Sequence, residues 1–242
     1  MFPRKTLIFA VLALSLALAP ACVIEGGGGG GPMQEKTENV PLGGVGEAEI
    51  ALDISAGEIV VRGADSADLL AGTFRYNRPR LEPEVNVVRG LADRARVSVR
   101  HLRRGGTIFG RVRNTWDLTL STRVPIDLDL DCGAGRTDLD LRGLDLKSLT
   151  IDMGVGELKA DLTGERSRSL DVTVDGGVGE ATFVLPAAIG VRVEVDGGLG
   201  SVNAPGFAKS GRVYTNEVWG RTEASITISV DAGIGSVNLK LR

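Results

Sequence analysis

Five Gly-x-Gly units are the segments of this 242-residue chain whose composition and spacing most resemble a ligand site. An aspartate stands two residues before the first glycine of each unit. The glycines are Gly133 and Gly135, Gly154 and Gly156, Gly177 and Gly179, Gly198 and Gly200, and Gly233 and Gly235. The aspartates are Asp131, Asp152, Asp175, Asp196 and Asp231. Glycine-rich loops can bind phosphate and clustered carboxylates can bind Ca²⁺, so the pattern raises two candidate ligands.

The residues that follow the glycines exclude the phosphate ligand. A nucleotide loop needs a helix directly after its glycines, but Leu158, Ala160 and Leu162 alternate with polar residues after the second unit. We therefore interpret the glycines as structural turns, where the backbone adopts conformations that a Cβ would forbid. The apolar residue between the glycines is in phase with the inward row, and we predict that it closes the end of the core.

The aspartates before the glycines have two interpretations. A calcium-binding repeat usually supplies more oxygen ligands per turn than one carboxylate. We therefore expect each aspartate to accept hydrogen bonds from the backbone amides of its own corner, with calcium binding as the alternative.

Arginines are concentrated between residues 89 and 113, in a pattern typical of a hairpin. Guanidinium groups on one strand face could bind phosphate or carboxylate groups in a bidentate manner. Lipid headgroups or anionic glycans would fit such a face. The alternative is a solvated face whose charge is balanced by the aspartates between residues 127 and 145. The possible anion-binding residues are Arg96, Arg100, Arg103, Arg104, Arg111 and Arg113.

Aromatic residues are concentrated in the segment 205–220, although the whole chain contains only 4% of them. Tyrosine and tryptophan are enriched at recognition surfaces, which makes Phe207, Tyr214 and Trp219 possible partner-binding residues. The alternative is that these rings cover an end of the core.

No set of residues predicts catalysis. His101 is the single histidine, and this weakens every Ser-His or Cys-His mechanism. Glu157 and Glu180 follow two corners, but Ser201 and Ser236 take the same place in other repeats. The net charge of −3 predicts no bulk attraction to nucleic acid. We expect no enzyme activity, no metal centre, no cofactor and no small-molecule substrate.

The glycine units recur at intervals of 21, 23, 21 and 35 residues, measured between their second glycines. Residues on both sides of each unit alternate between apolar and polar, which predicts two strands per repeat with one buried face. Repeats of about 20 residues indicate a stacked array. We predict an all-β, single-stranded β-solenoid with two strands per coil, and an antiparallel β-sandwich or meander as the alternative.

The N-terminus predicts export. Arg4 and Lys5 precede an apolar run that ends before Cys22, and this arrangement is typical of a signal peptide. The sequence Ala19-Pro20-Ala21-Cys22 resembles a lipobox, so we predict lipidation of Cys22, with ordinary cleavage after Ala21 as the alternative. The glycine run that follows predicts a flexible tether. The other cysteine, Cys132, has no predicted disulfide partner.

Residues 47–77 provide a family resemblance. The sequence EAEIALDISAGEIVVRGADSADLLAGTFRYN contains an Ala-Gly corner between two strands, and it ends with Gly72, Phe74, Tyr76 and Asn77 in a Gly-x-Phe-x-Tyr-Asn pattern. This resembles the N-terminal part of the toast-rack family. The Gly-x-Gly repeats resemble the C-terminal half of that family, which it shares with LiaF-like envelope-stress proteins and adhesin-like solenoids. The resemblance implies a β-solenoid in a bacterial envelope protein without catalysis.

These observations predict four regions. They are a signal peptide (1–21), a lipid-anchored Gly-rich linker (22–40), a toast-rack N-terminal β region (41–125), and a repeat β-solenoid (126–242) with the insert 205–220. The predicted function is that of a membrane-anchored envelope lipoprotein that acts as an adhesin-like binding or scaffold module. Its expected partners are the membrane and an envelope protein, an anionic glycan or lipid. The alternative is an envelope-stress sensor that contacts a membrane partner.

Overall fold

The computed structural model describes residues 31–101 and 112–242, and these residues are almost entirely β-strand. The exception is one 3-10 turn, η1 (Pro79–Leu81). The strands are β1 (Gln34–Pro41), β2 (Glu47–Ile54), β3 (Gly57–Ala64), β4 (Asp68–Tyr76), β5 (Pro83–Arg89), β6 (Arg94–His101), β7 (Asn114–Ser121), β8 (Ile126–Asp140), β9 (Leu146–Asp161), β10 (Leu170–Leu185), β11 (Gly190–Asn203), β12 (Ala208–Ser210), β13 (Val213–Thr215) and β14 (Ser225–Leu241).

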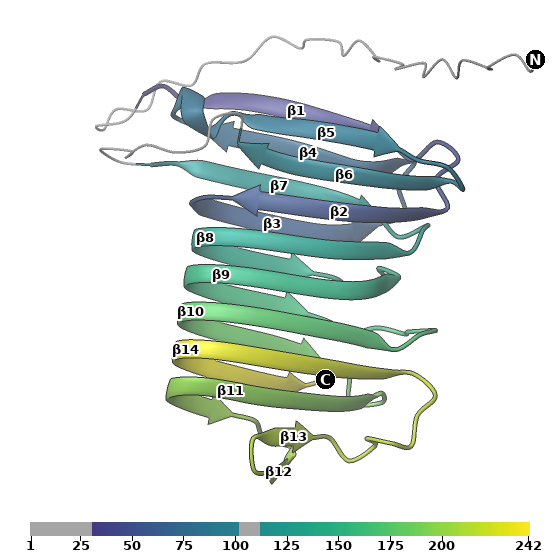
Figure 1. The fold of residues 1–242 in the computed structure, drawn as a ribbon, viewed down its shortest axis with the longest axis vertical. Helices are drawn as coiled ribbons and strands as arrows, with labels where there is room; N and C mark the ends of the chain where they lie inside the picture. Colours follow the sequence, from purple (N-terminus) through teal and green to yellow (C-terminus); the bar gives the residue numbers. More distant parts are fainter. Residues whose placement is uncertain (1–30, 102–111) are drawn as a thin grey trace, which may run out of the picture.

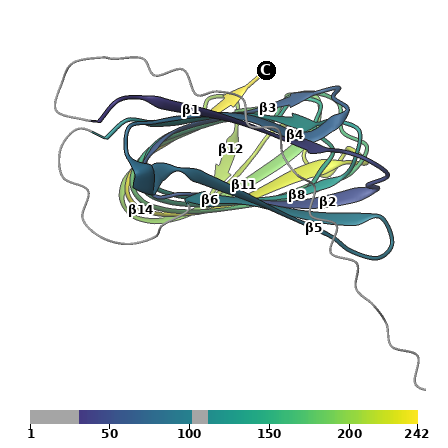
Figure 2. The same ribbon diagram turned by 90° about the horizontal axis from the view of Figure 1, so that it is seen from above.

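The repeats stack as coils of a solenoid, which confirms the predicted fold class (Figure 1). Strands β8, β9, β10, β14 and β11 each bend at their glycine corner and pass from one face of the molecule to the other (Figure 2). Neighbouring coils are parallel and in register on both sides of the corner, from Leu128 opposite Leu149 to Leu139 opposite Ala160. Each coil therefore contributes one strand segment to a front sheet and one to a back sheet.

The solenoid begins before residue 126. Strands β2 and β3 form a coil of their own, because β2 pairs with the first half of β8 and β3 with its second half. Strands β6 and β7 lie in the next layer, parallel to β2 and β3 respectively. The predicted boundary between residues 125 and 126 therefore falls between two coils of one continuous stack. Strand β1 begins at Gln34, inside the segment predicted as linker 22–40.

The spatial order of the coils differs from their order in the sequence. The C-terminal strand β14 lies between β10 and β11 and pairs in parallel with both. The segment after β11 forms the short strands β12 and β13 and then returns to place β14 one layer higher (Figure 1). The 35-residue interval in the repeat is thus a return connection. It closes the stack by inserting its last strand between two earlier ones.

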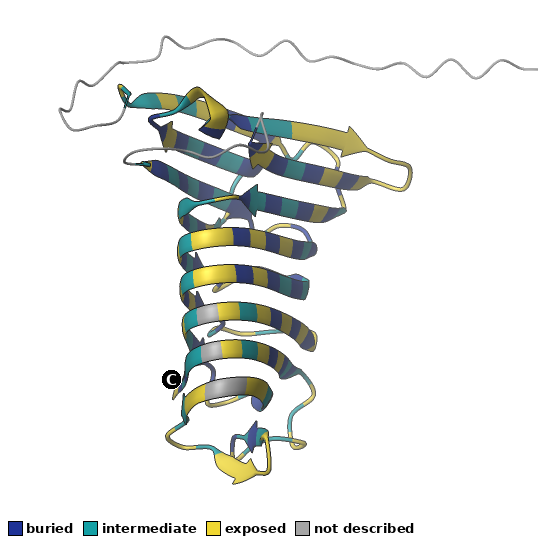
Figure 3. Cartoon of the chain, turned by 60° about the vertical axis from the view of Figure 1, so that its left-hand side comes forward, coloured by how far each residue is buried: buried dark blue, intermediate teal, exposed yellow. Residues whose placement is uncertain are grey.

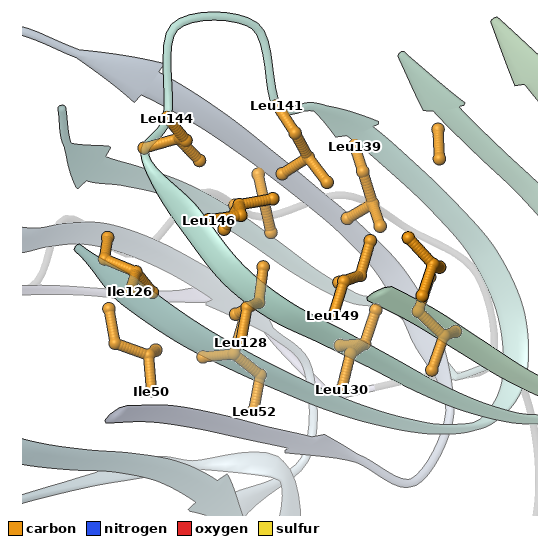
Figure 4. Close-up of a cluster of buried hydrophobic side chains, with 14 of the residues drawn as sticks. Ile50, Leu52, Ile126, Leu128, Leu130, Leu139, Leu141, Leu144, Leu146 and Leu149 are labelled. Carbon is orange, nitrogen blue, oxygen red and sulfur yellow. The ribbon is translucent and has the colours of Figure 1, made fainter. Parts of the chain in front are cut away.

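The core is a narrow double row of aliphatic side chains between the two sheets. Figure 4 shows Ile50, Leu128 and Leu149 from three successive coils in one row, with Leu139 and Leu141 from the other sheet. Their burial produces the alternating bands along the strands in Figure 3. This alternation is the period-two pattern that predicted the strands. Among the described residues, no helix is long and apolar enough to span a bilayer.

At the corners, the second glycine is required by the close approach of neighbouring backbones. A Cβ on Gly156 would lie 1.8 Å from the carbonyl oxygen of Gly135, and φ of Gly156 is 150°. The same contact recurs through the stack, and it begins at Gly57, whose carbonyl oxygen would lie 1.8 Å from a Cβ on Gly135. Ser55-Ala56-Gly57 is therefore one more corner of the same kind, although it lacks the first glycine.

The residue between the glycines does not close the core at the corners where its side chain is described. Val155 is 55% exposed, and Ala134 is also exposed. Met153 and Leu158 are both buried, so the alternation is interrupted by the four residues between them. The prediction was wrong because the backbone bends around the core at this point, and a side chain at the apex of the bend points away from the interior.

We predict that Gly156→Ala lowers the free energy of unfolding by about 4 kcal/mol, because the new methyl group collides with a carbonyl that cannot move independently of its own coil. Chemical denaturation of the variant would measure this loss. Gly176→Ala is the matched control, because Gly176 has no positive φ and its nearest contact would be 3.9 Å away. Ala232 already occupies the equivalent position of the next coil. Equal stability of the two variants would contradict the steric explanation.

Candidate functional site

An aspartate column is the most regular polar feature of the front sheet. Parallel pairing places Asp131 opposite Asp152, and Asp231 opposite both Asp175 and Asp196. Asp152 is opposite Asp175, and Asp53 of β2 extends the column upward by pairing with Asp131. Neighbouring strands in a sheet are about 4.8 Å apart, so like charges repeat at that spacing. The column therefore accumulates negative charge along the solenoid axis.

Arginines lie at both ends of this column. Arg100 of β6 is opposite Asp53, and its guanidinium donates a hydrogen bond to Glu84 at 3.0 Å. Arg212 forms an ion pair with Asp196 at the other end. Beside the column, partial burial and the negative charges of Asp152, Asp131 and Glu49 raise the pKa of Asp129. The middle of the front sheet thus has an excess of acidic groups that the flanking arginines do not neutralise.

The structure supports neither interpretation of the aspartates. Within the described chain, the carboxylates of Asp131 and Asp152 accept no hydrogen bond from the amides of their own corners. No group of three or more His, Cys, Asp or Glu side chains in the described residues is arranged to hold a metal ion.

The possible anion-binding arginines are distributed over different environments. Arg96 pairs with Glu49 at 2.7 Å, and Arg100 pairs with Glu84. Arg113 is exposed at the start of the segment that leads into β7. Arg103, Arg104 and Arg111 lie outside the described residues. The partners of Arg96 and Arg100 are glutamates of β2 and β5, the strands beside β6, and not the aspartates between residues 127 and 145.

The back sheet carries opposite-charge pairs between neighbouring strands, although Glu157 and Glu180 also lie opposite each other. Arg136 pairs with Glu157 at 2.7 Å, and Lys159 pairs with Asp138 at 3.7 Å. The glutamates that follow the corners lie in register with the serines of the other repeats, from Glu180 to Ser236. Opposite charges on adjacent strands stabilise a sheet by up to about 1 kcal/mol per pair, which is the reverse of the situation in the front aspartate column.

The insert 205–220 lies at the lower end of the solenoid. Tyr214 of β13 is 6% exposed and belongs to the core, and Phe207 packs against the core while partly exposed. Trp219 is half-buried in the connection that leads to β14. The structure therefore places Phe207 and Tyr214 where they cover an end of the core. A cavity of about 230 Å³ lies beside them, lined by residues that include Lys209, Arg212 and Tyr214.

Sequence reasoning missed a polar cluster at the uppermost corner. His101 is 3% exposed, its Nδ1 lies 3.0 Å from Ser55 Oγ, and its Nε2 lies 3.1 Å from Asn114 Nδ2. Its ring packs edge-on against Trp116, with the ring centroids 5.3 Å apart. The single histidine of the chain was the available signal, but only the folded chain brings it to the side chain of Ser55.

The hydrogen bonds of this cluster fix the histidine tautomer. Asn114 Nδ2 donates a hydrogen bond to the backbone oxygen of Ala56 at 2.7 Å, so the atom facing His101 Nε2 is a donor. Nε2 must then accept, and the proton on Nδ1 is donated to Ser55 Oγ. A general base would need to accept the serine proton. The cluster therefore holds the corner in place and does not activate Ser55 as a nucleophile.

Stacked two-sheet coils with glycine corners define the class of protein as a toast-rack β-solenoid. Residues 29–184 match the family model described as the N-terminal domain of toast_rack, DUF2154. Because this match spans more than half of the chain, the protein belongs to the toast-rack family.

Comparison with solved structures gives a second line of similarity. The chain is similar to a crystal structure of a "putative cell adhesion protein" from Clostridium sporogenes, with 28% sequence identity and a TM-score of 0.81. The similarity covers 87% of this chain and 100% of that one. A "putative adhesin" from Bacteroides fragilis is also matched, at 10% identity over 86% of this chain and 96% of that one. Its TM-score of 0.26 is too low to carry an argument. The search of curated proteins gave no match.

We predict that Asp152→Asn raises the free energy of unfolding by about 0.5 kcal/mol at low salt, because it removes repulsion from the aspartates directly opposite on both neighbouring strands. Salt should reduce this gain, since screening weakens interactions between exposed charges. Denaturation at two ionic strengths would measure both effects. Asp138→Asn is the control, because Asp138 faces Lys159 on the back sheet and its removal should not stabilise the protein. A salt-independent gain would contradict the repulsion argument.

We predict that the protein loses stability between pH 6.5 and about pH 4 because of His101. Burial lowers the pKa of His101 to about 4, below its ordinary value of 6.5. In this interval the unfolded chain binds a proton that the folded chain does not. Lowering the pH from 6.5 to about 4 therefore reduces the free energy of unfolding by up to about 3 kcal/mol. Denaturation across this pH range would measure the slope. His101→Gln should show a smaller slope, and identical slopes would exclude His101 as the cause.

Proposed function

We propose that the protein is an exported, lipid-anchored component of a bacterial cell envelope and acts as a non-catalytic, adhesin-like binding or scaffold module. The observation that carries this proposal is the similarity to the cell adhesion protein from Clostridium sporogenes, which combines 28% identity with a TM-score of 0.81 over all of that chain. The two proteins are therefore similar in sequence as well as in fold.

The shape of the fold supports a binding role. The two sheets present broad, regular surfaces along a slim molecule, and the interior is filled by side chains (Figures 1 and 4). Ligand pockets of enzymes are usually deep and largely apolar. The back-sheet cavity bordered by Arg62, Asp140 and Arg142 is instead an open region lined mainly by charged residues. Such surfaces suit contacts with other macromolecules.

The position of the chain entry supports anchoring. Strand β1 is an edge strand at the upper end of the stack, and the predicted tether leads directly into it. A lipid on Cys22 would therefore hold the solenoid by one end and leave both sheet faces accessible. Two acyl chains hold firmly, because each buried CH₂ contributes about 0.8 kcal/mol.

Mass spectrometry of the mature N-terminus from membrane fractions tests the anchor. We expect an acylated Cys22 as the first residue, and Cys22→Ser should release the protein from the membrane. An unmodified N-terminus at another residue would contradict the proposed anchoring, but it would leave the binding role open to its own test.

A binding assay tests the adhesive role. We expect the folded protein to be retained on immobilised cell-wall polysaccharide or on host-cell surfaces, and heat-unfolded protein to serve as the control. Recovery of a membrane sensor kinase in place of such a surface would favour the envelope-stress sensor. Turnover of the polysaccharide that is lost on changing one carboxylate would show an enzyme.

A further inference from the structure

The tip of the β5–β6 hairpin exposes apolar side chains to an unusual degree. Leu91 at the tip is 93% exposed, and Val88 on β5 is 58% exposed. Single exposed apolar residues are common on protein surfaces. Here, however, Val87 is exposed as well, so three large aliphatic residues lie within five positions of one hairpin. This is the apolar tip that the following paragraphs refer to.

The structure holds the apolar tip in place. The guanidinium of Arg89 donates hydrogen bonds to the backbone oxygens of Pro41 and Leu42, and the backbone oxygen of Asp93 accepts one from Gly46 at 2.7 Å. Ala92 and Asp93 both adopt positive φ, at 60° and 57°. Left-handed backbone at a non-glycine residue is disfavoured and persists only when its surroundings impose it. The connection between β1 and β2 therefore braces the tip in an extended position.

The apolar tip lies in the uppermost layer of the solenoid, beside the end of β1, and the predicted tether enters the same layer at the start of β1. Among the strands that the structure describes, β5 pairs only with β6 and β1 only with β4, so both are edge strands of the uppermost layer (Figures 1 and 2). Lys36 of β1 donates a hydrogen bond to the backbone oxygen of Pro83, which ties the start of β5 to the strand that follows the tether. Gln34 lies twelve positions after Cys22. A Gly-rich chain of that length has an r.m.s. span of about 20 Å, so an anchor at Cys22 keeps this end close to the bilayer.

The charge of the described chain becomes more negative along the same axis. The described residues 31–101 and 112–125 contain 11 Lys and Arg against 12 Asp and Glu, whereas residues 126–242 contain 12 against 18. The second group forms the lower coils, including most of the aspartate column. An anionic lipid surface therefore repels the lower coils more strongly than the upper end. This asymmetry favours an upright orientation with the upper end against the membrane.

We propose that the apolar tip inserts Leu91 and Val88 into the interfacial zone of the bilayer that holds the anchor, as a second membrane contact beside the lipid anchor. This inference rests on the proposed anchoring at Cys22. The contact fixes the orientation of the solenoid, so that the sheet faces stand perpendicular to the membrane. Contact with lipid removes the exposed aliphatic side chains of the braced hairpin from water, which is energetically favourable.

A fluorophore at the tip tests the insertion in the anchored protein. Leu91→Cys is labelled with an environment-sensitive dye, in full-length protein reconstituted through its own anchor into vesicles of phosphatidylcholine and phosphatidylglycerol. We expect a several-fold rise in emission with a blue shift, and quenching by lipids that carry a nitroxide on the acyl chain. Val155→Cys is the matched control, because Val155 is also an exposed apolar residue but lies on a lower coil. Equal emission from both positions would overturn the proposal.

A second measurement separates the tip from the anchor. Vesicle sedimentation of the Cys22→Ser protein, which has no acyl chain, measures the affinity of the tip alone. We expect Leu91→Asp to weaken binding to anionic vesicles at least about tenfold, since it replaces a buried leucine with a charge. Val155→Asp should leave binding unchanged. Leu91→Asp could instead convert a dimer to monomers without changing vesicle binding. In that case the tip is an interface between copies of the chain, and the bilayer proposal fails.

Discussion

The carbonyl oxygen of one corner occupies the place where a side chain would begin on the corner below. A Cβ on the second glycine of a unit would lie 1.8–2.0 Å from that oxygen from Gly135 down to Gly200. This contact allows the backbones to stack at the spacing of hydrogen-bonded strands while the chain bends sharply. Because the bends coincide, the strands on both sides must also coincide. The register of the whole solenoid follows from this one steric condition.

Strict register has consequences that differ between the interior and the surface. In the interior it aligns aliphatic side chains, as with Ile50, Leu128 and Leu149, and each row then excludes water along its length. On the front sheet the same register aligns aspartates, and the carboxylates in the middle of the column have like-charged neighbours above and below. Like charges directly opposite each other destabilise a sheet. Like charges also lie opposite each other on the back sheet, at Glu157 and Glu180, but there Arg136 pairs with Glu157 and offsets part of the cost.

The two ends of the stack differ in how their outermost strands are covered. At the lower end, β14 enters between β10 and β11, and β13 covers part of the last coil with Tyr214. The C-terminal strand is therefore hydrogen-bonded on both sides and does not form a frayed edge. At the upper end, β1 and β5 are edge strands next to the chain entry. An end that carries the tether and exposed aliphatic residues is suited to a surface, whereas the opposite end is closed by its own chain.

The sequence by itself determined the strands, the glycine corners and the solenoid class, because period-two alternation and recurrent glycines are local signals. It also determined most of the aspartate column, since the carboxylate has a fixed place in each repeat. It did not reveal Asp53 as a member, because the corner Ser55-Ala56-Gly57 has a serine where the others have glycine. The outward direction of Val155, the position of β14 between β10 and β11, and the contact between Ser55 and His101 were decided by the tertiary structure alone. Each depends on how distant segments pack, and no local pattern encodes which coil a strand will join or which side of a bend faces water.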